Sequence, residues 1–438
     1  MVIFVRAAKS FFRFLDIRPE EVRRVGLMFS LFFLLLAANS VLKILRDSVF
    51  LGHHSATELP YVYLSVALFS GTIIAAYSHY TTRIPLNRLI LFSNAFIFSI
   101  TVLFWFLRTF FDTSWLHYAI YIWSAMVGAI TIAQAWTFAS ELFDLDEANR
   151  FYSIFTAGGT LGGATGAFGA KWAVLPFVET NELFWFAGTL FAAACGVAFL
   201  ARKERRAAAD DSLKTSTNPK EVAEKSSYHF LRSSRYLQVI AGMIFVSIVV
   251  STLIDFQFKS AVKDSYPSEK ALTDFFSSYY AWLYVVTLLT QLFLTGKLRK
   301  FLGLVPSLLV TPAVLGVGSV GIMVWPGLFT ATATRMADGA LRTSVHRSGM
   351  EMLYIPVPAK VKKQLKTFID VVVERASDAT AGFIILVYTT IWTTSDVTEV
   401  HFVCIGLILV WAALTVLVRR GFQKFPHEIL EQRTSSQL

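Results

Sequence analysis

Apolar stretches of about twenty residues recur along the whole chain, and they constrain its fold more than any other feature of the sequence. Each is long enough to cross a hydrocarbon core about 30 Å thick. Charged residues make up only 16% of the chain and hydrophobic residues 55%, whereas a soluble domain has about 25% charged residues. The sequence therefore predicts an all-α polytopic membrane protein.

Twelve membrane-spanning helices are predicted from these stretches. They are expected at 25–46, 59–79, 88–110, 114–140, 150–174, 182–201, 236–259, 275–296, 303–323, 327–347, 364–391 and 398–418. The tenth contains ATATRMADGALRTSVHR, which is too polar to face lipid. Such a helix is acceptable in a membrane only where one of its sides lines a cavity.

Lys and Arg are concentrated at both ends of the chain and in the connections after the second, sixth, eighth and tenth helices. By the positive-inside rule both termini are expected in the cytoplasm. Residues 1–24 mix Phe with Lys and Arg, which indicates an interfacial segment. The polar stretch 201–235 is predicted to be a cytoplasmic linker between two six-helix bundles, 1–200 and 236–438. This is the plan of the major facilitator fold, with a site near the middle of the membrane.

Charged side chains recur at helical spacing inside four of the predicted helices. They are Lys43, Arg46 and Asp47 after Asn39 in the first, Asp255 and Lys259 in the seventh, Arg335, Asp338, Arg342 and His346 in the tenth, and Lys366, Asp370, Glu374 and Asp378 in the eleventh. Charges at membrane depth are costly and usually face a bundle interior or a water-filled path. The set favours a transport pathway.

Two structural interpretations of these charges stay open. Lys366 with Asp370, and Arg335 with Asp338, have the spacing of simple intrahelical ion pairs. Residues near the helix ends, such as Lys43 and Lys366, are also placed to reach lipid headgroups.

Several other patterns carry no chemistry. The glycine-rich run 156–170 lacks the Gly-Lys-Ser/Thr ending of a phosphate-binding loop, and its small-xxx-small spacing predicts close helix packing instead. Cys195 and Cys404 lie in apolar segments and are interpreted as small buried hydrophobes. Neither His53-His54 nor any other group has the pattern of a metal site, and no nucleophile–base arrangement is recognisable. We expect neither an enzyme nor a cofactor.

Four stretches carry a resemblance to a known family. They are EMLYIPVPAKVKKQLKTFIDVV (351–372), LIDFQFKSAVKDSYP (253–267), WTFASELFDLDEANRFYSIFTAGG (136–159) and NSVLKILRDSVFL (39–51). The chain resembles the nucleotide transporters, the ATP/ADP translocases of plastids and obligate intracellular bacteria, as a divergent member. The resemblance extends over nearly all twelve helices and implies a major-facilitator-like fold.

The resemblance also implies which positions bind substrate. Arg46 and Lys366 stand where the family has functional lysines, Lys43 where it has an arginine, and Asp255 where it has a glutamate. Ser124 and Tyr63 depart from the pattern, because the family has a glutamate and a lysine there. With the charges of the seventh, tenth and eleventh helices, the expected substrate-binding residues are Lys43, Arg46, Tyr63, Ser124, Asp255, Lys259, Arg342, Lys366 and Asp370.

The expected function is exchange of ATP and ADP, or of related nucleotides, by alternating access. Cations would contact phosphates, while Asp255 and Asp370 would hold those cations when the site is empty. Tyr63 or Tyr121 would stack a base, unless the two rings serve only in packing. We expect a monomer in a bacterial inner membrane that binds a small anionic substrate, a nucleotide such as ATP or ADP or else phosphate, and no nucleic acid.

Two alternatives stay open. A proton-coupled symporter of another anionic metabolite would use Asp255, Asp370 or Glu374 as the coupling carboxylate. A non-transporting membrane scaffold is the other, although the short loops argue against it.

Overall fold

The computed structural model of the chain describes residues 18, 21–81, 86–143, 145–212, 235–355, 357, 369–391 and 398–435. Over these ranges every regular element is a helix and no strand occurs. The predicted all-α class is therefore confirmed. A helix satisfies its backbone hydrogen bonds within one apolar segment, as a chain in a membrane requires.

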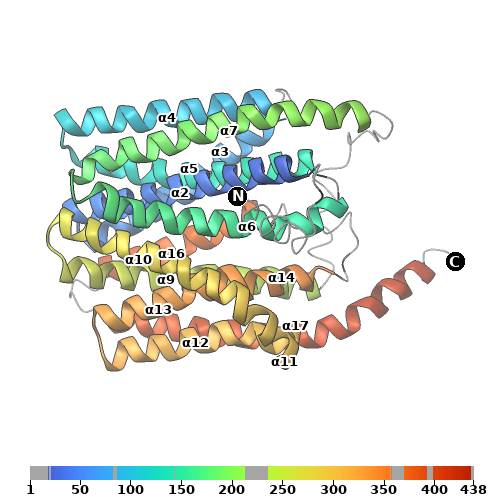
Figure 1. The fold of residues 1–438 in the computed structure, drawn as a ribbon. Helices are drawn as coiled ribbons and strands as arrows, with labels where there is room; N and C mark the ends of the chain where they lie inside the picture. Colours follow the sequence, from blue (N-terminus) through green and yellow to red (C-terminus); the bar gives the residue numbers. More distant parts are fainter. Residues whose placement is uncertain are drawn as a thin grey trace, which may run out of the picture. The chain divides into compact units, whose positions relative to one another are not determined.

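Helices lie over all twelve predicted segments. The first six correspond to α2 (Val22–His53), α3 (Leu59–Thr81), α4 (Leu86–Phe110), α5 (Ser114–Leu142), α6 (Leu145–Phe168) and α7 (Leu183–Ser212). The last six correspond to α9 (Arg235–Ser265), α10 (Glu269–Leu289) with α11 (Thr295–Leu302), α12 (Leu304–Val324), α13 (Leu328–Leu341) with α14 (Arg347–Leu353), α16 (Glu374–Ile391) and α17 (Thr398–Ser435). Figure 1 shows these helices.

Some boundaries differ from the predicted ones. Helix α10 begins six residues before the predicted start at 275, because Ser268 caps it by accepting a hydrogen bond from the backbone N–H of Ala271 at 3.3 Å. Helix α7 continues to Ser212, so the predicted linker begins as helix. Most of that linker, and most of the predicted interfacial segment 1–24, lie outside the described residues.

Several helices contain a wider π-helical turn. One such turn, η5 (Arg342–His346), separates α13 from α14, and another, η6 (Ile369–Val373), leads into α16. Further π turns are η2 (Gly169–Val174) after α6 and η4 (Thr290–Leu294) before α11. The polar tenth predicted helix is thus two α-helical pieces with a π turn between them. Such turns occur frequently at functional sites.

Eight helical stretches in the described part of the chain are long and apolar enough to cross a membrane. They are Val22–His53, Leu89–Phe110, Ser114–Leu142, Thr180–Ala201, Arg235–Ser265, Glu269–Leu302, Leu304–Val324 and Val400–Arg419. The other four predicted segments are helical where described. Among them, helix α16 has Glu374, Arg375 and Asp378 within its 18 residues.

The chain divides into two compact units. The first comprises residues 1–50, 75–218 and 273–285, and the second comprises 51–74, 219–272 and 286–438. Each unit contains chain from both sides of the predicted linker. The division into bundles 1–200 and 236–438 stays a prediction.

Close helix contacts hold the first unit together. Helices α4 and α7 lie side by side (Figure 1), and both contact α5. A Cβ added at Gly162 of α6 would collide with the carbonyl oxygen of Phe33 in α2, and one at Gly166 would lie 2.5 Å from that of Ala37. The predicted close packing through the glycine-rich run is therefore confirmed, since only glycine lets the two backbones approach this far.

Helix α9 is the centre of the second unit. It contacts α13, α16 and α17, while α12 lies against α13 and α17 (Figure 1). A Cβ added at Gly318 of α12 would lie 2.6 Å from Oγ1 of Thr334, so α12 and α13 also approach closely. Asp255 and Lys259 of α9 therefore lie among several helices of their own unit.

Candidate functional site

The first unit contains a cluster of cations and tyrosines. This tyrosine–cation cluster consists of Lys43, Arg46 and Asp47 on α2, Tyr121 on α5, and Tyr280 and Tyr284 on α10. Its members come together from segments more than 200 residues apart in the chain.

Arg46 and Asp47 form a two-point ion pair within this cluster. Nε of Arg46 lies 2.9 Å from Oδ1 of Asp47, and Nη2 lies 3.2 Å from Oδ2. The hydroxyl of Tyr280 donates to the same Oδ2 at 2.5 Å, and Asp47 is fully buried. The ring of Tyr121 covers the Arg46 guanidinium with 4.7 Å from Cζ to the ring centre. Asp47 and one edge of Arg46 are thus occupied by protein groups.

Lys43 has a different environment. Its Nζ lies 6.0 Å from the ring centre of Tyr280 and 5.9 Å from that of Tyr284, which are cation–π distances. Among the described residues, no carboxylate pairs with this half-buried ammonium. With two cations and one carboxylate, the cluster has one positive charge without an opposite charge.

The second unit contains an ion-pair network. This Asp255 network consists of Tyr63 on α3, Ser251, Asp255 and Lys259 on α9, and Arg335 and Asp338 on α13. Its two cations and two carboxylates balance in number.

Asp255 accepts three contacts. The Tyr63 hydroxyl donates to Oδ2 at 2.8 Å, Nζ of Lys259 lies 2.9 Å from the same oxygen, and Nη2 of Arg335 lies 2.9 Å from Oδ1. The side chain of Lys259 is 1% exposed and that of Arg335 is 24% exposed. Lys259 also lies over the Tyr63 ring, 5.6 Å from its centre. The carboxylate of Asp255 therefore holds both cations of the network.

Asp338 is fully buried and binds through a single oxygen. Its Oδ2 lies 2.5 Å from Nη1 of Arg335 and accepts a hydrogen bond from Ser251 at 2.6 Å. Its Oδ1 has no partner among the described residues. The intrahelical pairing predicted for Arg335 with Asp338 is confirmed, and Arg335 also joins α13 to α9.

The remaining predicted site residues are distributed as follows. Ser124 is buried and donates to the carbonyl of Ile120 in its own helix at 2.8 Å. Arg342 is half-buried, lies in the π turn η5 and forms no ion pair with a described residue. Lys366 and the side chain of Asp370 lie outside the described residues.

Asn39 of the first predicted helix and His346 of the tenth contact other helices of their own units. Asn39 donates to Oγ1 of Thr131 at 2.7 Å, so it ties α2 to α5. His346 is buried with its ring 5.3 Å from that of Trp411, on α17. The π turn at 342–346 interrupts the α-helical register within the tenth predicted helix.

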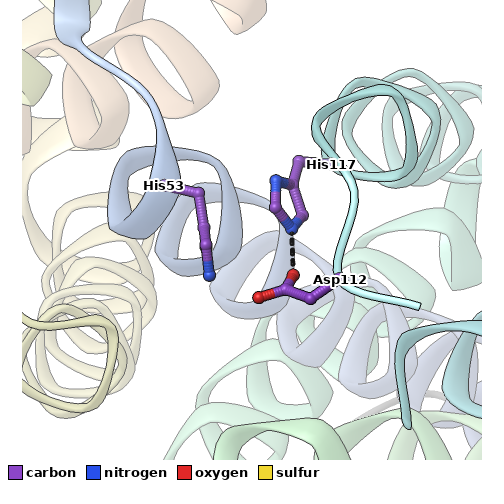
Figure 2. A group of neighbouring side chains, drawn as sticks. All are labelled: His53, Asp112 and His117. Carbon is purple, nitrogen blue, oxygen red and sulfur yellow. Dashed lines mark hydrogen bonds and ion pairs between the residues drawn. The ribbon is translucent and has the colours of Figure 1, made fainter. Parts of the chain in front are cut away.

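Histidines near the helix ends contact carboxylates of their own units. Figure 2 shows His117 beside Asp112, whose Oδ1 lies 2.8 Å from Nε2 of the histidine. In the second unit, Nδ1 of His53 lies 3.5 Å from Glu269 and that of His54 lies 2.9 Å from Glu58. Each of these three histidines therefore lies beside a carboxylate of its own unit.

The substrate-binding residues expected from the sequence do not include Tyr280, Tyr284 or Arg335. Tyr280 and Tyr284 are four residues apart, which places them on one face of the helix. That spacing is a usable signal for a shared role, but it does not name Lys43 as the group they contact. The sequence places Arg335 among the charges of the tenth predicted helix, but it gives no signal that assigns this residue to the site.

Comparison with known proteins supports the resemblance. The family model of the TLC ATP/ADP transporters matches residues 195–336. ADP,ATP carrier protein 1 of Chlamydia muridarum is 24% identical over 298 residues, which cover 60% of this chain and 56% of that protein. ADP,ATP carrier protein 1 of Chlamydia pneumoniae is 23% identical over 303 residues, covering 60% and 58%. The match thus spans little more than half the length of these relatives.

Solved structures share the fold. A bacterial homologue of the human lysosomal transporter Spinster, in an inward-facing conformation, aligns with a TM-score of 0.58 and 13% identity over 93% of this chain and 98% of that one. A POT family transporter in complex with 5-aminolevulinic acid aligns with a TM-score of 0.65 and 11% identity, over 90% and 96%. The chain is therefore an all-helical membrane protein that shares its fold with these transporters, and its sequence is similar to the TLC ATP/ADP transporters.

Proposed function

We propose that this protein is a secondary active membrane transporter that exchanges ATP, ADP or a related nucleotide by alternating access. It is not an enzyme, in keeping with the transporter family that its sequence matches. The observation that carries the proposal is Lys43, an ammonium inside an apolar helix with two tyrosine rings but no described carboxylate beside it.

A cation at this depth needs a compensating group, because burying an unpaired charge is costly. An incoming phosphate supplies that group through charge-assisted hydrogen bonds. Arg46 is adjacent on the same helix and keeps Nη1 outside its pair with Asp47. We assign Lys43 the first contact with the anion and Arg46 a supporting one.

The Asp255 network takes a different role in this proposal. Its cations are already held by carboxylates, so an anion must displace Asp255 or Asp338 to reach them. Arg335 is the more exposed of the two cations, whereas the side chain of Lys259 is buried. Exchange of partners at Arg335 would couple an anion to the contact between α9 and α13. The family match at 195–336 includes Asp255, Lys259 and Arg335, which supports a role in that family's activity.

The two tyrosines expected to stack a base are occupied by cations. Tyr121 lies against Arg46 and is 3% exposed, and Tyr63 lies against Lys259 and donates to Asp255. The proposal therefore rests on recognition of the phosphates, and it leaves these rings in packing roles.

Counter-exchange in proteoliposomes tests the function. Purified full-length protein is reconstituted in vesicles loaded with ADP, and uptake of labelled ATP is measured against vesicles without internal nucleotide. Uptake that requires internal nucleotide is the expected result. A thermal-shift series with ATP, ADP, phosphate and organic anions runs in parallel, since a ligand at 100 times its Kd stabilises the folded state by about 2.7 kcal/mol. Absence of both nucleotide uptake and nucleotide stabilisation would overturn the proposal.

One observation favours proton-coupled transport as a second candidate. Asp338 is a buried carboxylate inside α13 whose Oδ1 has no hydrogen-bond partner among the described residues, and carboxylates inside membrane helices mark proton relays in transporters. Collapse of the proton gradient distinguishes the two functions. Symport stops under this treatment, whereas exchange continues.

A further inference from the structure

We propose that Tyr284 positions Lys43 and that its hydroxyl, together with the Lys43 ammonium, forms the first contact for an oxyanion. The ligand class is a phosphate or a carboxylate. This inference deepens the proposed function and rests on it for the role of Lys43.

The ring of Tyr284 contacts two other helices of the first unit. It lies 5.9 Å from Nζ of Lys43 on α2. It also lies close to the backbone of α6, because a Cβ at Gly163 would stand 2.6 Å from both Cε1 and Cζ of the ring. Any residue larger than glycine at this position would displace the ring, and with it the hydroxyl on Cζ.

Tyr280, one helical turn earlier, is anchored differently. Its hydroxyl donates to the buried Asp47 at 2.5 Å, which fixes its ring 6.0 Å from Lys43. Lys43 therefore lies against two rings, and each ring has its own anchor in the first unit. The negative faces of aromatic rings stabilise an ammonium without occupying its hydrogen atoms.

The two tyrosine hydroxyls differ in what they offer a ligand. The Tyr280 hydroxyl is used by Asp47, whereas the hydroxyl of the half-buried Tyr284 has no hydrogen-bond partner among the described residues. The ammonium of Lys43 also lacks a carboxylate there. Two donor groups in one cluster, one of them charged, match an oxyanion. A carboxylate of the protein in this place would compete with the ligand.

The test uses the full chain and two substitutions at one position. Tyr284→Phe keeps the ring and removes only the hydroxyl, and Tyr284→Leu removes the ring as well. Gly163→Ala shifts the ring without changing its chemistry. Matched controls are Tyr61→Phe, on an exposed tyrosine of α3, and Gly196→Ala, where an added Cβ meets nothing within 4 Å.

Binding of ADP, inorganic phosphate, citrate and adenosine is measured by thermal shift, and KM and maximal rate are measured by nucleotide exchange. Tyr284→Phe is expected to weaken oxyanion binding about ten-fold, the factor for a hydrogen bond worth about 1.4 kcal/mol. Its maximal exchange rate should stay within about two-fold of wild type, and Tyr284→Leu should weaken binding further. Adenosine, which has no oxyanion, is expected to be unaffected.

The outcomes separate this inference from the proposed function. If the wild type exchanges nucleotide and Tyr284→Phe binds ADP with unchanged affinity, the inference is overturned while the proposed function stands. If the wild type exchanges no nucleotide but phosphate or citrate stabilises it, loss of that stabilisation in Tyr284→Phe supports the oxyanion site while the nucleotide proposal fails. Stabilisation by none of the oxyanions overturns both. If Gly163→Ala does not fold, Tyr284→Phe decides the question.

Discussion

The hydroxyl of Tyr63 lies 2.8 Å from Oδ2 of Asp255 and joins α3 to α9 within the second unit. The same oxygen is 2.9 Å from Nζ of Lys259, whose ammonium lies over the Tyr63 ring. One tyrosine thus contacts a buried ion pair at both of its charges. The resemblance to the nucleotide transporters implies a lysine at this position, and the structure supplies a reason for the tyrosine: it donates to a carboxylate that already holds two cations.

Tyr63→Phe removes this hydrogen bond while keeping the ring under Lys259. A hydrogen bond to a charged group contributes about 1.5–3 kcal/mol, and we expect the free energy of unfolding in detergent to fall by about that amount. Tyr61→Phe, on an exposed tyrosine of the same helix, is the control. Equal stability of the two variants would show that Tyr63 does not support Asp255.

Arg335→Ala should lower the free energy of unfolding much more than Lys43→Ala. Loss of Arg335 leaves the buried Asp338 without its cation, and breaking a buried ion pair costs about 3–5 kcal/mol. Loss of Lys43 breaks no described ion pair and is expected to leave the unfolding free energy nearly unchanged. Denaturant or thermal unfolding of the two variants measures this contrast. A large loss of stability in Lys43→Ala would indicate a structural cation.

Lys43→Ala is also expected to abolish nucleotide-dependent stabilisation and to raise the KM of exchange at least about ten-fold, because a charge-assisted contact to phosphate is lost. Lys43→Arg keeps the charge and should recover part of this affinity. Wild-type affinity in Lys43→Ala, measured on folded protein, would remove Lys43 from the site.

Gly162→Ala should separate α2 from α6. Its added Cβ collides with the backbone carbonyl of Phe33, which cannot move aside as a side chain can. Overpacking of this kind costs about 1–3 kcal/mol, and we expect that loss or a failure to fold. Gly196→Ala tests the same substitution in open space and should be close to neutral. A neutral Gly162→Ala, measured by thermal unfolding, would contradict the close approach of these helices.

Local pattern was sufficient for much of the architecture. Helices lie over all twelve predicted segments, and eight helical stretches of the described chain are long and apolar enough to cross a membrane, because such a stretch is stable in lipid only as a helix. Helical spacing also identified the pair of Arg335 with Asp338, since residues three or four apart share a face. The spacing of the glycine-rich run 156–170 likewise predicted a close helix contact, which α6 makes with α2.

Spacing along one helix does not say which other helix lies opposite. The sequence by itself determined that this protein is a helical membrane protein with charges inside its helices and a resemblance to nucleotide transporters. Only the tertiary structure decided which groups contact each charge. It brings Tyr280 and Tyr284 to Lys43 from more than 230 residues away, and it pairs Arg335 of α13 with Asp255 of α9. The physical reason is that the hydrophobic effect is non-directional: it buries the apolar face of a helix without specifying which helix packs against that face. An ion pair or a ring contact forms only when folding places both partners within a few ångströms.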